Sequence, residues 1–83
     1  MKVSLRFFAS IREALGPGED IEVAEGTTVG ELRDLLIARG EPHASAVSRG
    51  RPLRCALNQT LCGETEPLTN GAELAFFPPV TGG

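Results

Sequence analysis

One segment with the periodicity of a helix constrains the fold of this chain more than any other feature. It is flanked by segments in which apolar and polar residues alternate. Residues 2–7 place three apolar side chains on one face, which is the period-two pattern of a half-buried strand. Residues 20–23 and 73–77 alternate in the same way. We therefore predict a strand in each of these segments and expect the first two strands to pair.

Residues 28–39 form the segment with helical periodicity. Thr28 and Glu31 have the spacing of a capping box, which predicts the first turn of a helix. Gly40 occupies the position where a left-handed residue often ends a helix, and Pro42 prevents continuation. The expected apolar stripe of this helix consists of Val29, Leu32, Leu35 and Leu36. The polar side chains expected to face outward are Arg33, Asp34 and Arg39.

Weaker patterns complete the predicted domain. Ser10 and Glu13 also fit a capping box, which indicates a short helix that ends at the glycines of residues 16–18. Residues 53–58 and 61–62 indicate a strand and a very short strand separated by a turn, whereas residues 41–52 show little periodicity. The order of these elements indicates an α+β domain with one main helix.

Length and charge limit what the chain can do. With 83 residues there is room for one domain and no large enclosed cavity. Eight basic side chains are scattered against eleven acidic ones, for a net charge of -3, so we expect no nucleic-acid partner. Neither a bilayer-spanning apolar run nor the apolar core of a signal peptide is present, so we expect a cytoplasmic location and no membrane contact.

The residue types that usually carry catalysis are scarce. The single histidine, His43, stands in the least patterned segment, and we expect a surface position for it. Cys55 and Cys62 have no neighbouring ligands with zinc spacing, so we expect two free thiols with structural roles and no bound metal. Glu64 and Glu66 flank a proline loop and indicate a solvated acidic segment. We therefore expect no self-contained active site.

The C-terminal segment is more informative. Pro78 and Pro79 follow the last strand and cannot continue its hydrogen-bond ladder, so residues 1–77 are predicted to form the domain and residues 78–83 an extended tail. Six residues beyond Phe77 span roughly 20 Å when extended. Gly82 and Gly83 give the tail a narrow end without Cβ atoms, suited to threading a partner's active site. The competing interpretation is a frayed terminus.

Two phenylalanines break the alternation of their strands. Phe8 and Phe77 fall on the face where polar residues are expected. Exposed aromatic residues on a small acidic domain are typical of a partner surface. The alternative is that both side chains close the end of the hydrophobic core.

On these residues the chain resembles the small, sulfur-carrying subunits of molybdopterin synthase, a family of ubiquitin-like proteins. The motifs that carry the resemblance are Phe7-Phe8-Ala9, Arg12-Glu13, Asn58-Gln59-Thr60-Leu61, Pro67-Leu68-Thr69 and the terminal block Phe76-Phe77-Pro78-Pro79-Val80-Thr81-Gly82-Gly83. The resemblance extends over the whole chain. It implies a ubiquitin-like β-grasp fold, in which a mixed sheet of four or five strands packs on one main helix.

The resemblance also implies a reaction cycle centred on Gly83. An adenylating enzyme related to ubiquitin-activating enzymes would use ATP to adenylate its carboxylate, and sulfur would then replace the adenylate to give a thiocarboxylate. Within a heterotetramer with the large synthase subunit, this group would donate sulfur to a pyranopterin precursor of the molybdenum cofactor. The carrier would itself be non-catalytic and bind no stable cofactor. The residues implied at the partner interface, besides Gly82 in the threaded tail, are Phe8, Leu61, Phe77, Pro78, Pro79, Val80 and Thr81.

Proteins with other functions end in the same two glycines. Sulfur carriers of the thiamine pathway and of transfer-RNA thiolation share this chemistry, although the length and the Phe76–Pro79 block favour the molybdopterin interpretation. Protein conjugation, as in ubiquitin, is a further alternative, although Lys2 would be the sole lysine acceptor for chain building on this protein. The last alternative is an interaction module with an inert tail.

Overall fold

The computed structural model describes residues 1–79 and contains five strands and three helices in the order β1, α1, β2, α2, α3, β3, β4, β5. The strands are β1 (Lys2–Phe7), β2 (Gly18–Glu22), β3 (Arg54–Leu57), β4 (Thr60–Cys62) and β5 (Glu73–Phe77). The helices are α1 (Ala9–Leu15), α2 (Val29–Ala38) and α3 (His43–Ala46). The predicted strands are all present, and their bounds differ from the predicted ones by no more than two residues.

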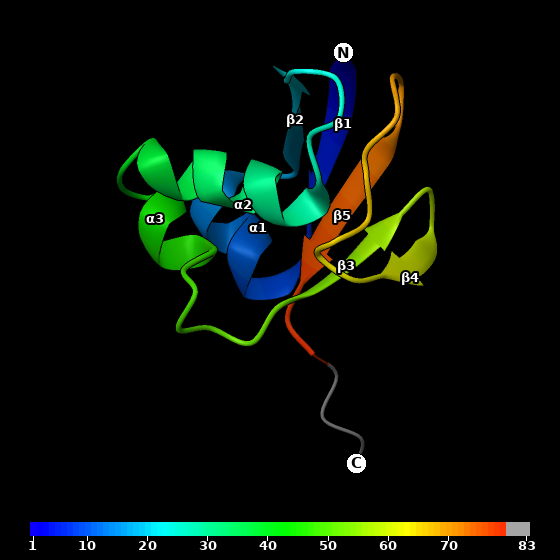
Figure 1. Cartoon of the computed structure of the whole chain (residues 1–83). Coiled ribbons are helices and arrows are strands. Elements are labelled where there is room, and N and C mark those ends of the chain that lie inside the picture. The colour runs from blue at the N-terminus through cyan, green and yellow to red at the C-terminus, as the bar shows by residue number, and fades with distance from the viewer. Residues whose placement is uncertain (80–83) are drawn as a thin grey trace.

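All five strands form one mixed sheet in the order β2-β1-β5-β3-β4. The first and last strands, β1 and β5, lie parallel at its centre, and the other neighbours are antiparallel. The helices lie together on one face of this sheet, and α2 crosses it (Figure 1). This is the arrangement of a ubiquitin-like β-grasp, so the predicted α+β fold class is confirmed.

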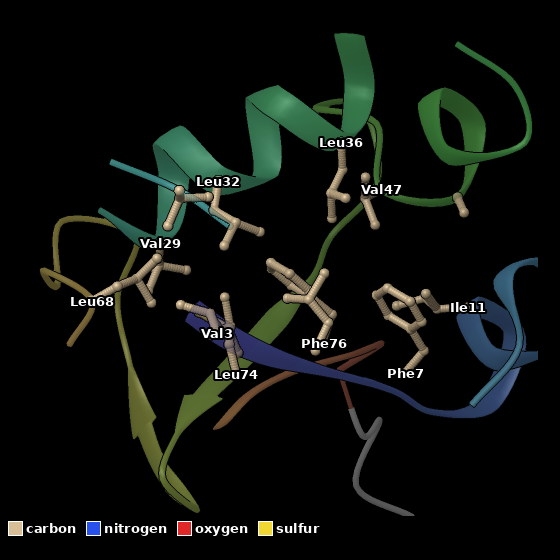
Figure 2. Packing of buried hydrophobic residues seen from close by; sticks show 14 residues of the cluster. Val3, Phe7, Ile11, Val29, Leu32, Leu36, Val47, Leu68, Leu74 and Phe76 are labelled. Carbon is tan, nitrogen blue, oxygen red and sulfur yellow. The ribbon is translucent and has the colours of Figure 1, made fainter. Parts of the chain in front are cut away.

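The core lies between the sheet and the helices. Figure 2 shows side chains of α2, among them Val29, Leu32 and Leu36, above Phe76 and Leu74 of the central strand. These five side chains are at most 1% exposed. Burial of a large apolar side chain contributes about 1.5–3 kcal/mol. The alternation read from the sequence therefore identifies the buried face of the sheet.

The capping box of α2 is formed as predicted. The Thr28 side chain accepts a hydrogen bond from the Glu31 backbone N–H (3.2 Å), and the Glu31 carboxylate accepts one from the Thr28 N–H (2.8 Å). Gly40, with φ +85°, is in the left-handed conformation expected beyond the helix end. Both ends of the main helix are thus determined by local residues.

The predicted faces of α2 are wrong at two positions. Arg33, expected to face outward, is 4% exposed, whereas Leu35, expected in the stripe, is 48% exposed. At 3.6 residues per turn, Arg33 lies about 40° around the helix from Val29 and Leu35 about 120°. The geometry of the helix therefore places the arginine nearer the buried stripe than the leucine.

Helix α1 begins differently from its prediction. Its N-cap is Phe8, which makes no side-chain capping hydrogen bond, and Ser10 lies inside the first turn. The chain continues from β1 into the helix through Ala9, whose φ of +54° is left-handed. This sharp change of direction lets the helix start with only Phe8 between it and the strand, so the capping box at Ser10 is not used. Helix α3, within the weakly patterned segment, was not predicted.

Replacement of Thr28 by alanine tests the capping box. We expect Thr28→Ala to lower the free energy of unfolding by about 0.5–2 kcal/mol, because the first turn of α2 loses an N-cap acceptor. Ser10→Ala is the matched control and should change stability by less than about 0.5 kcal/mol, because Ser10 caps no helix. Urea denaturation measures both values. Equal effects of the two substitutions would contradict the assigned caps.

Among residues 1–79, no helix is both long and apolar enough to cross a lipid bilayer.

Candidate functional site

The base of the C-terminal segment lies beside the helical layer. β5 ends at Phe77, and the half-buried Pro78 and Pro79 follow it. The residues that line the shallow pocket at this point are Ser10, Ile11, Ala46, Arg51, Pro52, Leu53, Pro78 and Pro79. The first two residues of the predicted tail therefore border the folded domain. Val80, Thr81, Gly82 and Gly83 lie outside the described residues, so their predicted roles remain predictions.

The face of the sheet turned away from the helices carries a row of aligned residues that is apolar except for Arg6. The strand register aligns Arg6 with Ala75, Ala75 with Ala56, and Ala56 with Leu61 across four strands. Leu61 is 60% exposed, although it is large and apolar. Because Leu61 ends this row on the edge strand β4, a partner can reach it from the side as well as from above. Below we call Phe8, Ala56, Leu61, Ala75 and Phe77 the outer patch.

Phe8 and Phe77 extend this row toward the tail. Each lies one residue beyond the paired residues Phe7 and Phe76, and the Phe8 N–H donates to the Phe76 carbonyl at 3.2 Å. Phe8 is extended and 41% exposed, and Phe77 is half-buried. Neither belongs to the cluster of buried apolar residues. The structure thus places the three predicted docking residues on one face, with Phe77 next to the start of the tail.

A tight turn positions Leu61. Asn58 and Gln59, with φ of +50° and +69°, form the two-residue loop between β3 and β4. Left-handed conformations at both positions match the twist of a hairpin, and asparagine tolerates them well. The Asn58 side-chain oxygen also accepts a hydrogen bond from the Glu73 backbone N–H (3.0 Å), and the Asn58 backbone N–H donates to the Glu73 carbonyl (2.8 Å). The Asn58-Gln59-Thr60-Leu61 motif is therefore a turn that fixes the register of the outer patch.

The buried Arg33 anchors the loop beside the tail. Its guanidinium donates to the carbonyls of Val47 (2.8 Å), Ser48 (2.5 Å) and Arg51 (3.1 Å) and to the Glu64 carboxylate (2.7 Å). A planar guanidinium with five donors can satisfy all four acceptors at once. Since the segment that begins at Arg51 lines the pocket next to the prolines, Arg33 links the main helix to the base of the tail.

A second arginine completes this network at the surface. Arg49 donates to Asp34 (2.9 Å), to the Gly30 carbonyl (3.0 Å) and to Glu64. Gly30 lies so close to Glu64 that an added Cβ would come within 3.0 Å of its carboxylate. The acidic loop at Glu64 is therefore docked on α2, whereas the sequence indicated a solvated loop. One feature of the sequence could have revealed this network: at 3.6 residues per turn, Arg33 falls next to the apolar stripe of α2.

The network makes stability depend on pH. The hydrogen bond from Arg49 is the largest cause that lowers the pKa of the Glu64 carboxyl, partial burial acts in the opposite direction, and Arg33 lowers it further. A pKa that is lower in the folded state means that the ionised carboxylate stabilises the fold above its ordinary pKa of 4.5, and that this stabilisation is lost as pH falls through the folded value.

Glu64→Gln tests this pH dependence. We expect the stability difference between the wild type and this variant to be constant from about pH 6 to 8 and to shrink below pH 4.5, where the wild type becomes protonated. Denaturant unfolding at several pH values measures it. A difference that grows on acidification would contradict the assigned role of Glu64.

Comparison with known proteins places this chain among relatives that match it over nearly its full length. The profile of the ThiS family matches residues 5–83. The molybdopterin synthase sulfur carrier subunit of Escherichia coli is 43% identical over 81 residues, which cover 98% of this chain and 99% of the relative. The subunit of the same name from Haemophilus influenzae is 39% identical, with coverage of 98% and 99%. Small archaeal modifier protein 3 of Haloferax volcanii is 35% identical, with full coverage of both chains.

Solved structures support the same relationship. A chain in the complex of subunits 1 and 2 of the molybdopterin-converting factor from Helicobacter pylori is 30% identical, with a TM-score of 0.69 and full coverage of both chains. SAMP1 from Haloferax volcanii is 25% identical, with a TM-score of 0.77 and full coverage. The β-grasp arrangement of the described residues agrees with these structural matches. The chain belongs to the ThiS family.

Proposed function

We propose that this chain is the sulfur-carrier subunit of a molybdopterin synthase. The observations that carry this proposal are the matches to relatives of this name over at least 98% of the chain and the match of the family profile through Gly83. The described part of the chain agrees with a carrier that docks on a partner, because Phe8 and Leu61, two of its three exposed large apolar residues, lie on the outer face of the sheet. In this role the chain supplies the sulfur and the partner supplies the active site.

The proposed chemistry takes place at the Gly83 carboxylate. Its oxygen attacks the α-phosphate of ATP in an adenylating enzyme, which forms an acyl-adenylate and releases pyrophosphate. A hydrosulfide nucleophile then adds to the acyl carbon and AMP leaves, so that a thiocarboxylate remains. Adenylation is needed because a carboxylate has no good leaving group. Glycine suits this chemistry because it lacks a Cβ and can enter a narrow channel.

The large synthase subunit is the proposed docking partner. One structural relative occurs in a complex of subunits 1 and 2 of the molybdopterin-converting factor, which supports a partner of this kind. We propose that the outer patch docks on this partner while the tail enters the partner's active site, within a heterotetramer of two large and two small subunits. An adenylating enzyme related to ubiquitin-activating enzymes is the second proposed partner.

Affinity purification from the native host tests this assignment. A tag at Met1 leaves Gly83 free and preserves the backbone donor that bonds to the Val23 carbonyl at 2.6 Å. We expect the large subunit of molybdopterin synthase and an adenylating enzyme to co-purify. Recovery of a thiazole synthase or of a transfer-RNA thiolation enzyme in their place would contradict the proposal and indicate another sulfur pathway.

Aspartate substitutions test the docking face. We expect Leu61→Asp and Phe77→Asp to weaken binding to the large subunit by more than about thirtyfold, the effect of losing a central apolar contact. Leu35→Asp is the matched control, because Leu35 is 48% exposed but lies on α2. Titration calorimetry gives the affinities, and circular dichroism verifies the fold. Equal binding by all three variants would exclude the outer patch, whereas unfolding of Phe77→Asp alone would favour a core role for Phe77.

Protein conjugation is the second candidate, favoured by the relative named small archaeal modifier protein 3. A conjugating protein forms an isopeptide bond between its terminal carboxyl group and a lysine of a target. Denaturing purification from the native host separates the two functions. Ladders of covalent adducts that contain Gly83 linked to lysine would establish the modifier function, and their absence together with a thiocarboxylate would favour the carrier.

A further inference from the structure

The two cysteines face each other across a hairpin. Cys55 on β3 and Cys62 on β4 are directly paired in the antiparallel register, and their Sγ atoms lie 3.8 Å apart as free thiols. The Cys62 thiol points toward the Cys55 sulfur, and the Cys55 thiol donates to the Cys62 carbonyl at 3.3 Å. The sequence predicted two thiols with structural roles, and Cys55, at 6% exposure, is indeed buried against the core.

This geometry is compatible with a covalent bond. Directly opposed residues of antiparallel strands have Cα atoms about 4.5–5.5 Å apart. A disulfide spans about 4.4–6.8 Å between Cα atoms, so the backbone can remain where it is while the side chains rotate. The two residues also differ in access, because Cys62 is half-buried on the edge strand β4 and Cys55 is buried on the adjacent inner strand β3.

We propose that Cys55 and Cys62 form a reversible oxidation site, which reacts with peroxides and closes to an intramolecular disulfide. In the first step the Cys62 sulfur attacks one oxygen of the peroxide, the O–O bond breaks, and a sulfenic acid and water are formed. In the second step the Cys55 sulfur attacks the Cys62 sulfur. The S–O bond breaks, and the proton of Cys55 leaves with the hydroxyl group as a second water. Two thiols are oxidised, and one molecule of hydrogen peroxide is reduced to two waters.

The environment determines the order of these steps. Burial, followed by the hydrogen bond with Cys62, raises the pKa of the Cys55 thiol to about 12. A buried thiol that remains protonated is a poor first nucleophile, so oxidation begins at the more accessible Cys62. Cys55 then acts at short range, where proximity compensates for its weak ionisation.

The pairing has a protective consequence. A sulfenic acid without a neighbouring thiol is open to further oxidation to a sulfinic acid, which ordinary reductants do not reverse. Cys62 adjoins Leu61, whose side chain belongs to the outer patch on the other face of the same strand. Capture by Cys55 therefore keeps oxidation beside the outer patch reversible. This inference does not depend on the proposed carrier function.

Intact-mass analysis of the reduced, folded full chain during exposure to hydrogen peroxide tests the proposal. We expect the monomer to lose two hydrogens, with the bond mapped to Cys55 and Cys62 by peptide analysis, and dithiothreitol to restore the original mass. A wild-type product that gains oxygens at Cys62 without this loss, or that forms only intermolecular dimers, would overturn the proposal.

Two single variants separate the roles of the thiols. Cys55→Ala should accumulate a sulfenic acid at Cys62 that dimedone traps, and then a sulfinic acid that dithiothreitol does not reduce. Cys62→Ser retains the buried thiol alone and should react at least tenfold more slowly than Cys55→Ala. Irreversible oxidation of the wild type as fast as that of Cys55→Ala would contradict the protective role, and equal rates in both variants would contradict the proposed order of steps.

Discussion

Deletion of Gly83 is expected to abolish sulfur transfer while the domain remains folded. The shortened chain still ends in a glycine carboxylate, but that carboxylate lies about 3.5 Å short of its original position along an extended chain. A displacement of this size removes the reacting group from an active site that requires placement within a fraction of an ångström. Residues 1–79, which contain the described fold, are untouched.

A reconstituted assay with the adenylating enzyme, a sulfur source and the large subunit measures this effect. We expect thiocarboxylate and molybdopterin formation to fall to background for the deletion and also for a chain extended by one residue beyond Gly83. The unfolding midpoint in urea should match that of the wild type in both cases. Sulfur transfer by either variant at the wild-type rate would show that the terminal carboxylate is not the carrier group.

Replacement of Arg33 by alanine is expected to give the largest loss of stability among the substitutions considered, about 2–4 kcal/mol. The side chain is 5% exposed, so its removal leaves three backbone carbonyls without their donor and a cavity in place of the guanidinium. A small domain has a total stability of about 5–15 kcal/mol, so a large part of it would be lost.

Arg49→Ala is the matched control for this prediction. Arg49 shares Glu64 with Arg33, but its side chain is 47% exposed, and ion pairs at the surface contribute at most about 1 kcal/mol. Arg33→Lys should fall between the two, because an ammonium group cannot reach all four acceptors. Urea denaturation distinguishes these cases, and a loss of equal size for Arg33→Ala and Arg49→Ala would contradict the anchoring role of Arg33.

Local patterns were sufficient to predict most of the fold. Residues 2–7, 20–23 and 73–77 alternate because one face of the sheet is buried, and Thr28 and Glu31 satisfy each other without help from the rest of the chain. Patterns failed where tertiary contacts decide. Arg33 is buried because three carbonyls of a distant loop need a donor, and α3 forms in a segment whose apolar residues follow no clear period.

The candidate site could be predicted only in part. Phe8 and Phe77 stood out because they break an alternation, and the register of the sheet places both with Leu61 on one face. The pocket beside Pro78 and Pro79 could not be predicted, because its other lining residues come from three segments that are distant in sequence. The terminal glycines lie outside the described residues, and their interpretation rests on the sequence and on the matched family.

The most direct test of the central claim is the mass of the intact chain isolated from its native host. We predict a fraction of molecules in which one oxygen has been replaced by sulfur, with fragmentation locating the exchange at Gly83. Loss of this fraction when the adenylating enzyme is removed would link the modification to the proposed cycle. A chain that carries an unmodified terminal carboxylate in every preparation, while the host actively makes molybdopterin, would contradict the account.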